Sequence, residues 1–150
     1  DRMDLRSEIK VFQEINKELE THPDLSFVVF PEGTRSKRPD FTLGSFHPGS
    51  FKIATRRDLP IVPVALFMTD RILYQKYHYK QYPVQISFLK PLYPSEYENM
   101  TSQEIAEYCH DAIEAELKNL KEKDVELVKS LNGYSDKKLN RVLYLPKIKA

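Results

Sequence analysis

The chain has 150 residues and a mass of 17.6 kDa, the size of one ordinary domain with room for a hydrophobic core. Its 23 Lys and Arg against 22 Asp and Glu give a formal net charge of +1. That balance excludes a strongly basic nucleic-acid-binding scaffold and an acidic disordered chain. The single Cys excludes a disulfide framework and a multi-cysteine zinc site, and it fits a reducing compartment.

The first predicted element is an amphipathic helix over residues 4–20. Its apolar stripe, with spacings of three and four, consists of Leu5, Ile9, Phe12, Ile15 and Leu19. The helix is expected to end at His22, because a residue before proline disfavours the helical conformation. Residues 26–30 are apolar and rich in β-branched and aromatic side chains, which predicts a buried, parallel strand. A loop over residues 31–40 and a short helix over 50–57 follow.

Two further strands and a long helix are predicted beyond this point. In the apolar run over residues 59–67, Pro63 has no N–H for a ladder and is expected at an edge or a bulge. Residues 84–89 alternate apolar and polar, which predicts a strand with one side facing the core. Thr101 and Glu104 form a capping-box pattern that opens a helix to about residue 123.

This order of elements indicates an α/β domain with a partial mixed sheet flanked by helices. The helical periodicity weakens from residue 124, so the predicted domain comprises residues 1–123 and a C-terminal extension comprises 124–150. Residues 137–149 of the extension are basic with interleaved apolar side chains, a modest candidate for contact with a membrane surface. The longest apolar run is far short of the roughly 18–20 residues that a membrane-spanning helix needs.

The most informative segment is Phe-Pro-Glu-Gly-Thr-Arg-Ser, which begins at residue 30. Gly33 supplies a conformation that other residues resist, so a sharp turn is expected. The hydroxyls of Thr34 and Ser36 are suited to surround an anion, and the guanidinium of Arg35 is suited to a phosphate. Glu32 is placed to orient Arg35 or to accept a hydrogen bond from a substrate hydroxyl. For a generic Gly-Thr-Arg triplet alone, a turn with solvated charges is the favoured interpretation.

The exact heptapeptide resembles the third conserved block of the 1-acyl-sn-glycerol-3-phosphate acyltransferase family, the glycerophospholipid acyltransferases. Residues 46–54 are similar to the segment that follows this block, with Gly49 in the expected place. Residues 61–64, Ile-Val-Pro-Val, resemble the fourth block, and Asp1-Arg2 resembles the end of the second. The resemblance covers residues 1–92 and implies a glycerolipid acyltransferase-like fold.

The resemblance implies transfer of an acyl group from acyl-CoA or acyl carrier protein to the hydroxyl of 1-acylglycerol-3-phosphate, giving phosphatidic acid. In the family a His-x-x-x-x-Asp pair supplies the general base and its orienting carboxylate. That spacing does not occur here, because the residues five positions after the four histidines are Phe27, Lys52, Pro83 and Ala115. We therefore expect the chain to be the C-terminal portion of such an enzyme, without a catalytic residue and inactive alone.

The resemblance also implies roles for individual residues. Arg2 and Arg35 are expected to hold the acceptor phosphate, with Glu32 and Thr34 orienting the glycerol. The remaining residues expected to bind substrate are Gly33, Ser36, Ile61, Val62, Pro63 and Val64, the last four along the acyl channel. The implied partners are a lysophospholipid, an acyl-CoA or acyl carrier protein donor and a membrane at its cytoplasmic face. No metal, other cofactor or nucleic acid is expected.

Two alternatives stay open. One is a different acceptor, either glycerol-3-phosphate or another lysophospholipid. The other is a non-catalytic module that binds anions or lipids at a membrane.

Several side chains outside the heptapeptide have a functional and a structural interpretation. His47 is a candidate phosphate contact or a solvated loop histidine. Cys109 is expected to be a buried small hydrophobe, and His110 and Asp111 are expected to point in different directions. The basic pairs and the tyrosines are candidates for anionic or membrane surfaces, or for a solvated face and a covering loop: Lys37, Arg38, Arg56, Arg57, Tyr74, Tyr77, Tyr79 and Tyr82.

Overall fold

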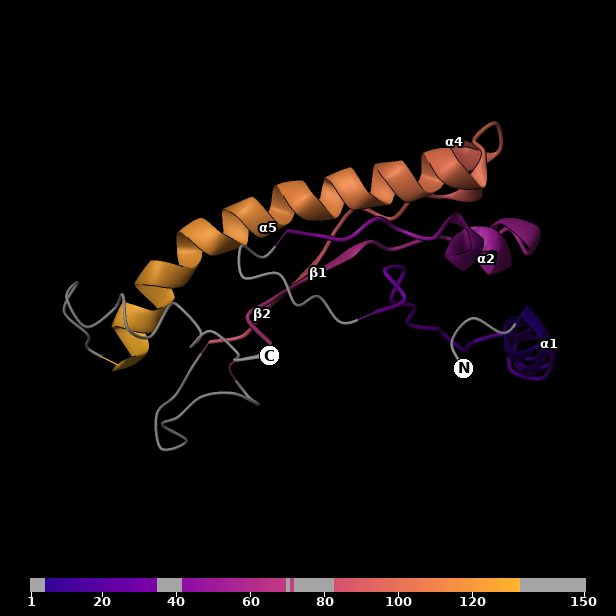
Figure 1. The fold of residues 1–150 in the computed structure, drawn as a ribbon, viewed down its shortest axis with the longest axis horizontal. Coiled ribbons are helices and arrows are strands. Elements are labelled where there is room, and N and C mark those ends of the chain that lie inside the picture. Colours follow the sequence, from indigo (N-terminus) through magenta and orange to yellow (C-terminus); the bar gives the residue numbers. More distant parts are fainter. Residues whose placement is uncertain (1–4, 35–41, 70, 72–82, 133–150) are drawn as a thin grey trace.

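The computed structural model describes residues 5–34, 42–69, 71 and 83–132. The elements in chain order are α1 (Leu5–Thr21), the 3-10 helix η1 (Pro48–Phe51), α2 (Lys52–Arg56), β1 (Val64–Phe67), β2 (Gln85–Phe88), α4 (Pro94–Tyr97) and α5 (Ser102–Asn132). Figure 1 shows α5 running along the two strands, with α2 and α4 gathered near its beginning.

The long helix α5 begins at the predicted capping box. The N–H of Thr101 donates to Glu104 Oε2 at 2.6 Å, and the N–H of Glu104 donates to Thr101 Oγ1 at 3.3 Å. Two backbone donors that a helix leaves without partners are thereby satisfied. The helix continues past residue 123 to Asn132, and Asp124 and Val128 on this continuation are buried. The weak periodicity after residue 123 therefore conceals a helical face that packs against the rest of the chain.

The described sheet has two antiparallel strands, with Val64 opposite Phe88 and Phe67 opposite Gln85. An isolated bridge joins Ile61 to Leu92 before the regular ladder begins. Pro63 lies between the bridge and the ladder, where its carbonyl accepts a hydrogen bond from the N–H of Leu89 at 2.9 Å. The ladder is thus interrupted at the residue that has no N–H to give, in line with the sequence prediction.

The sidedness of β2 differs from the prediction. Its apolar residues Ile86 and Phe88 are 58% and 75% exposed, whereas Gln85 and Ser87 are partly buried on the side of α5. Gln85 Nε2 donates to the backbone oxygen of Leu120 at 3.0 Å, which explains why a polar side chain faces the helix. Alternation along a strand identifies its two sides, but hydrogen bonding to α5 decides which one faces inward.

The predicted parallel strand over residues 26–30 is wrong. The structure has irregular chain there, and Val28 and Phe30 are 83% and 68% exposed. An apolar run becomes a strand only when a neighbouring backbone pairs with it, and no described segment lies in that position. The α/β class holds for the described part of the chain, with helices around a small sheet, but that sheet is antiparallel.

Two clusters of buried side chains form the core, and α5 contributes to both. The first packs Ile105, Ala106 and Cys109 of α5 against residues that include Phe51 and Leu92. The second packs two leucines of α5 against the buried side of β1, and comprises Ala65, Phe67, Met68, Leu117 and Leu120. The helix therefore fixes the position of η1 relative to the sheet.

A buried ion pair ties α5 to the chain after β1. Arg71 donates to both carboxylate oxygens of Asp124, at 2.6 and 2.5 Å, and the two side chains are 0% and 5% exposed. Arg71 also donates to the backbone oxygen of Pro83 at 3.1 Å. A planar guanidinium matches a carboxylate in this two-bond geometry, which is the arrangement that best compensates desolvation of the two charges.

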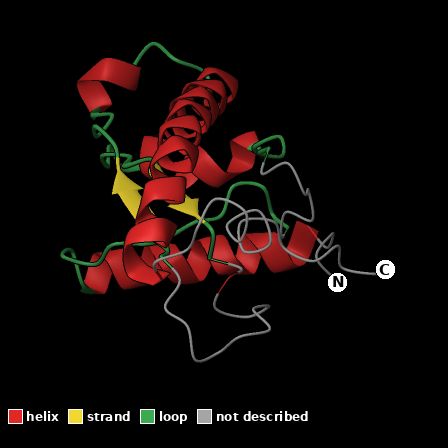
Figure 2. Ribbon diagram, turned by 90° about the vertical axis from the view of Figure 1, so that its left-hand side faces the viewer, coloured by secondary structure: helices red, strands yellow, loops and turns green. Residues whose placement is uncertain are grey.

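Helix α1 runs across the direction of α5. It is seen end-on in Figure 1 and from the side in Figure 2, the reverse of α5. Arg57 joins it to α2, because its guanidinium donates to Asn16 Oδ1 at 2.6 Å and to Glu20 at 2.8 Å. Arg57 is thus neither a solvated cation nor free for an anionic surface, in contrast to both sequence interpretations, while Arg56 is exposed. None of the helices within the described ranges is long and apolar enough to cross a bilayer.

Candidate functional site

The turn at residues 31–34 has the sharp geometry that the sequence predicted. Gly33 has a φ of +63°, a region that side chains with a Cβ rarely adopt, and its N–H donates to the oxygen of Phe30 at 3.0 Å. Gly33 and Thr34 are both exposed. The glycine therefore lets the chain reverse at the surface and leaves the following hydroxyl open to solvent.

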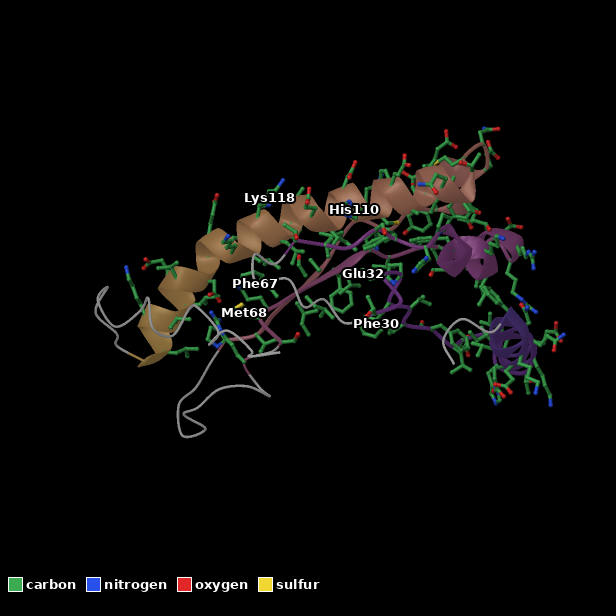
Figure 3. The ribbon with its side chains drawn as sticks, in the orientation of Figure 1. Phe30, Glu32, Phe67, Met68, His110 and Lys118 are labelled. Carbon is green, nitrogen blue, oxygen red and sulfur yellow. The ribbon has the colours of Figure 1, made fainter. Side chains whose placement is uncertain are left out.

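Glu32 has a partner that the sequence did not predict. Its Oε2 accepts a hydrogen bond from the backbone N–H of Gly44 at 2.7 Å. A Cβ at position 44 would lie 2.7 Å from the same oxygen, so only glycine allows this approach. In Figure 3, Glu32 lies on the side of Phe30 that faces α5. The carboxylate thus holds residues 42–47 against the turn.

A second contact joins the same two segments. The N–H of His47 donates to the backbone oxygen of Pro31 at 2.8 Å. The imidazole of His47 lies over Gly33, where an added Cβ would meet ring atoms Cδ2 and Nε2 at 3.2 and 3.3 Å. His47 itself is exposed. The turn, Glu32 and His47 therefore form one surface unit, which we call the turn site (residues 31–34, 44 and 47).

Part of the predicted site lies outside the described residues. This applies to three of the predicted substrate-binding residues, Arg2, Arg35 and Ser36, and also to Lys37, Arg38 and the four tyrosines Tyr74, Tyr77, Tyr79 and Tyr82. The predicted acyl-channel residues, in contrast, are described. Ile61 packs on the first core cluster, Pro63 is buried, Val64 is partly buried and Val62 is 44% exposed.

Two other candidates have clear surroundings. Burial raises the pKa of the Cys109 thiol to about 11, which suits a core residue and opposes a nucleophilic role. His110 and Asp111 do not point apart as predicted, because Nδ1 of His110 lies 3.2 Å from Asp111 Oδ1. The His110 ring also packs edge-on against Phe46, with ring centroids 5.1 Å apart. Within the described ranges, no three His, Cys, Asp or Glu side chains gather where they would hold a metal ion.

A family model described as Acyltransferase matches residues 1–67, which include the whole turn site. Residues 1–67 of the chain are therefore similar to the acyltransferase family. The sequence resemblance to 1-acyl-sn-glycerol-3-phosphate acyltransferases is thereby confirmed at the level of the family.

Curated relatives carry that more specific name. A 1-acyl-sn-glycerol-3-phosphate acyltransferase of Saccharomyces cerevisiae is 34% identical over 95 residues, 63% of this chain and 30% of the relative. A chloroplastic one from Brassica napus is 39% identical over 72 residues, 48% of this chain and 20% of the relative. One from Haemophilus influenzae is 32% identical over 106 residues, 71% of this chain and 42% of the relative. The chain thus spans less than half the length of these relatives.

A solved structure supports the fold. The 1-acyl-sn-glycerophosphate (LPA) acyltransferase PlsC from Thermotoga maritima superposes with a TM-score of 0.58 at 28% sequence identity. The match covers 73% of this chain and 44% of PlsC. The described helices and small sheet are therefore part of an α/β acyltransferase fold.

Proposed function

We propose that this chain supplies the acceptor-binding part of a 1-acyl-sn-glycerol-3-phosphate acyltransferase. The observation that carries the proposal is the turn site, in which Glu32 and Pro31 of the heptapeptide accept hydrogen bonds from the backbone N–H groups of Gly44 and His47 and Thr34 is exposed. The names of the curated relatives support 1-acylglycerol-3-phosphate as the acceptor in preference to the alternatives.

The proposed reaction moves an acyl group from a thioester to a glycerol hydroxyl. The carbon–sulfur bond of acyl-CoA or acyl carrier protein breaks, an ester carbon–oxygen bond forms, and the hydroxyl proton ends on the released thiol. The products are phosphatidic acid and the free thiol. The reaction as proposed requires no further cofactor.

The polar residues that the sequence predicted to bind the acceptor have proposed tasks. Arg2 and Arg35 hold the acceptor phosphate, because guanidinium groups bind phosphate oxygens in pairs. Thr34 and Ser36 add hydroxyl contacts to the same region. Glu32 acts through Gly44, as the residue that keeps the turn in place.

The remaining tasks concern the lipid chain and the membrane. Residues 61–64 border the acyl chain, with Val62 as the most exposed of the four. A lipid acceptor places the protein at a membrane, and we propose its cytoplasmic face. Since His-x-x-x-x-Asp does not occur in the sequence, we expect no acyl transfer from the 150-residue chain alone.

Steady-state kinetics of Arg35→Ala in the full-length protein test the proposal. The variant should raise the Michaelis constant for lysophosphatidate about tenfold or more and leave that for the thioester nearly unchanged. Arg56→Ala is the matched control, since Arg56 is an exposed arginine outside the turn site. Equal effects of Arg35→Ala on both substrates would contradict the phosphate role. A preference for glycerol-3-phosphate over lysophosphatidate would contradict the acceptor.

A further inference from the structure

His47 is tied to the turn through its main chain, because its backbone N–H donates to the backbone oxygen of Pro31. Its imidazole lies with the Cδ2–Nε2 edge against the face of Gly33 that has no side chain. A Cβ at position 33 would lie 3.2 Å from the ring, so the ring would have to shift by a few tenths of an ångström, and the φ of +63° would be strained. The glycine of the heptapeptide therefore makes room for this histidine as well as for the turn.

The ring of His47 has no polar partner among the residues that the structure describes. Within the described ranges neither nitrogen has a hydrogen-bond or ion-pair partner, and the residue is exposed. The acid of the same turn is engaged elsewhere, since Oε2 of Glu32 receives the Gly44 N–H. Thr34 follows Gly33 and is exposed, and Arg35 comes after it in the sequence. An imidazole in this position offers a hydrogen-bond donor beside Gly33, in the turn that leads to Arg35 in the sequence.

We propose that His47 is a further binding residue for the acceptor phosphate. An imidazole N–H donates to a phosphate oxygen, and in its protonated form the ring adds a positive charge. The contact rests on the proposed function of the turn site and deepens it, because it gives the phosphate a ligand from the segment that follows the heptapeptide. The alternative is that the ring only covers Gly33.

Three substitutions at this one position separate the two roles in the full-length protein. His47→Phe keeps an aromatic ring over Gly33 but removes both donors. His47→Lys removes the ring and restores a charged donor, and His47→Ala removes both features. If His47 binds the phosphate, His47→Phe and His47→Ala should raise the Michaelis constant for lysophosphatidate about tenfold. In His47→Lys this constant should stay within about threefold of the parent value. The Michaelis constant for the thioester should change less than twofold in all three.

Two kinetic outcomes would overturn the assignment. The first is a Phe variant equal to the parent together with an impaired Lys variant, which is the pattern of a packing role. The second is an equal rise in the Michaelis constants for both substrates.

Binding of inorganic phosphate gives a readout that does not depend on turnover. Titration of the full-length protein with inorganic phosphate should shift the NMR signals of the His47 ring protons. The affinity for inorganic phosphate should be lower in His47→Ala. If phosphate shifts the His47 signals but lysophosphatidate is not acylated, the proposed function fails and the phosphate contact stands. If the signals of His47 do not move while lysophosphatidate is acylated normally, the contact is wrong and the proposed function stands.

Discussion

Glu32 and Gly44 are joined by a 2.7 Å hydrogen bond from a backbone N–H to a carboxylate oxygen, across twelve positions of the chain. The acid of the family heptapeptide is thus directed at the protein's own backbone. A bond to a charged acceptor contributes about 1.5–3 kcal/mol in typical proteins, so its loss should be measurable.

Gly44→Ala should break this bond and displace Glu32. The new methyl group would lie 2.7 Å from Oε2, and the flexible carboxylate will swing away more easily than the backbone will move. We expect the free energy of unfolding to fall by about 1–2 kcal/mol and the Michaelis constant for the phosphate acceptor to rise. Gly49→Ala is the control, because nothing lies within 4 Å of a Cβ there. Equal behaviour of the two variants in denaturant titration and kinetics would contradict the role assigned to Glu32.

Asp124→Asn should destabilise the fold strongly. Removing one charge of a buried pair leaves the guanidinium of Arg71 without its counter-charge, which typically costs about 3–5 kcal/mol. The double variant Arg71→Met, Asp124→Leu removes both charges and should recover most of that loss. Urea titrations of Arg71→Met, Asp124→Leu and the double variant measure the coupling. A double variant as unstable as the sum of the singles would show that the ion pair is not a unit.

Cys109 should resist alkylation until the protein unfolds. Burial raises its pKa to about 11, so at pH 8 only about one folded thiol in a thousand is ionised, against about one in ten for an ordinary thiol with a pKa of 9.0. Iodoacetamide should therefore react at least about a hundredfold faster in denaturant. The folded protein should also lose stability as pH rises above 9, because the unfolded state gives up this proton first. Equal alkylation rates with and without denaturant would place Cys109 at the surface.

The capping box at the start of α5 makes the stability of the fold depend on pH in the acid range. Hydrogen bonds from the backbone N–H and side chain of Thr101 lower the pKa of Glu104, so the carboxylate stabilises the helix start above its unfolded pKa. That stability is lost as the pH falls through the lowered folded pKa. Glu104→Gln should flatten the acid end of the stability curve, and Thr101→Ala should cost about 1 kcal/mol at neutral pH. Thermal melts between pH 3 and 7 test both, and an unchanged acid slope in Glu104→Gln would rule out this contribution.

The helices of this chain could be predicted because their signals are local. The stripe of α1 and the Thr101–Glu104 box each lie within a few turns of one helix, and both predictions agree with the structure. The strands depend on distant partners. Residues 26–30 have strand-like composition but no described neighbour to pair with, and the side of β2 that faces inward is decided by Gln85 bonding to α5.

The candidate site divides in the same way. Gly33 was predictable, because a glycine between proline and polar residues signals a turn with an unusual backbone angle. The partner of Glu32 could not be predicted, because every residue except proline has a backbone N–H and the residue type does not show which one the carboxylate will meet. The only available signal was Gly44, a glycine whose missing side chain leaves room for the carboxylate. Arg57 was missed for a similar reason, since its partners Asn16 and Glu20 lie on a different helix.

The inverted strand β2 has a consequence for behaviour in solution. Ile86 and Phe88 stand on the open side of the sheet beside Leu66, which is 40% exposed and pairs with Ile86. These side chains contribute little to the described core, and together they form an exposed hydrophobic patch, a feature associated with self-association. In the isolated chain, Ile86 and Phe88 therefore govern solubility more than stability. Threonine at positions 86 and 88 would reduce self-association through this side of the sheet and leave its contacts with α5 intact.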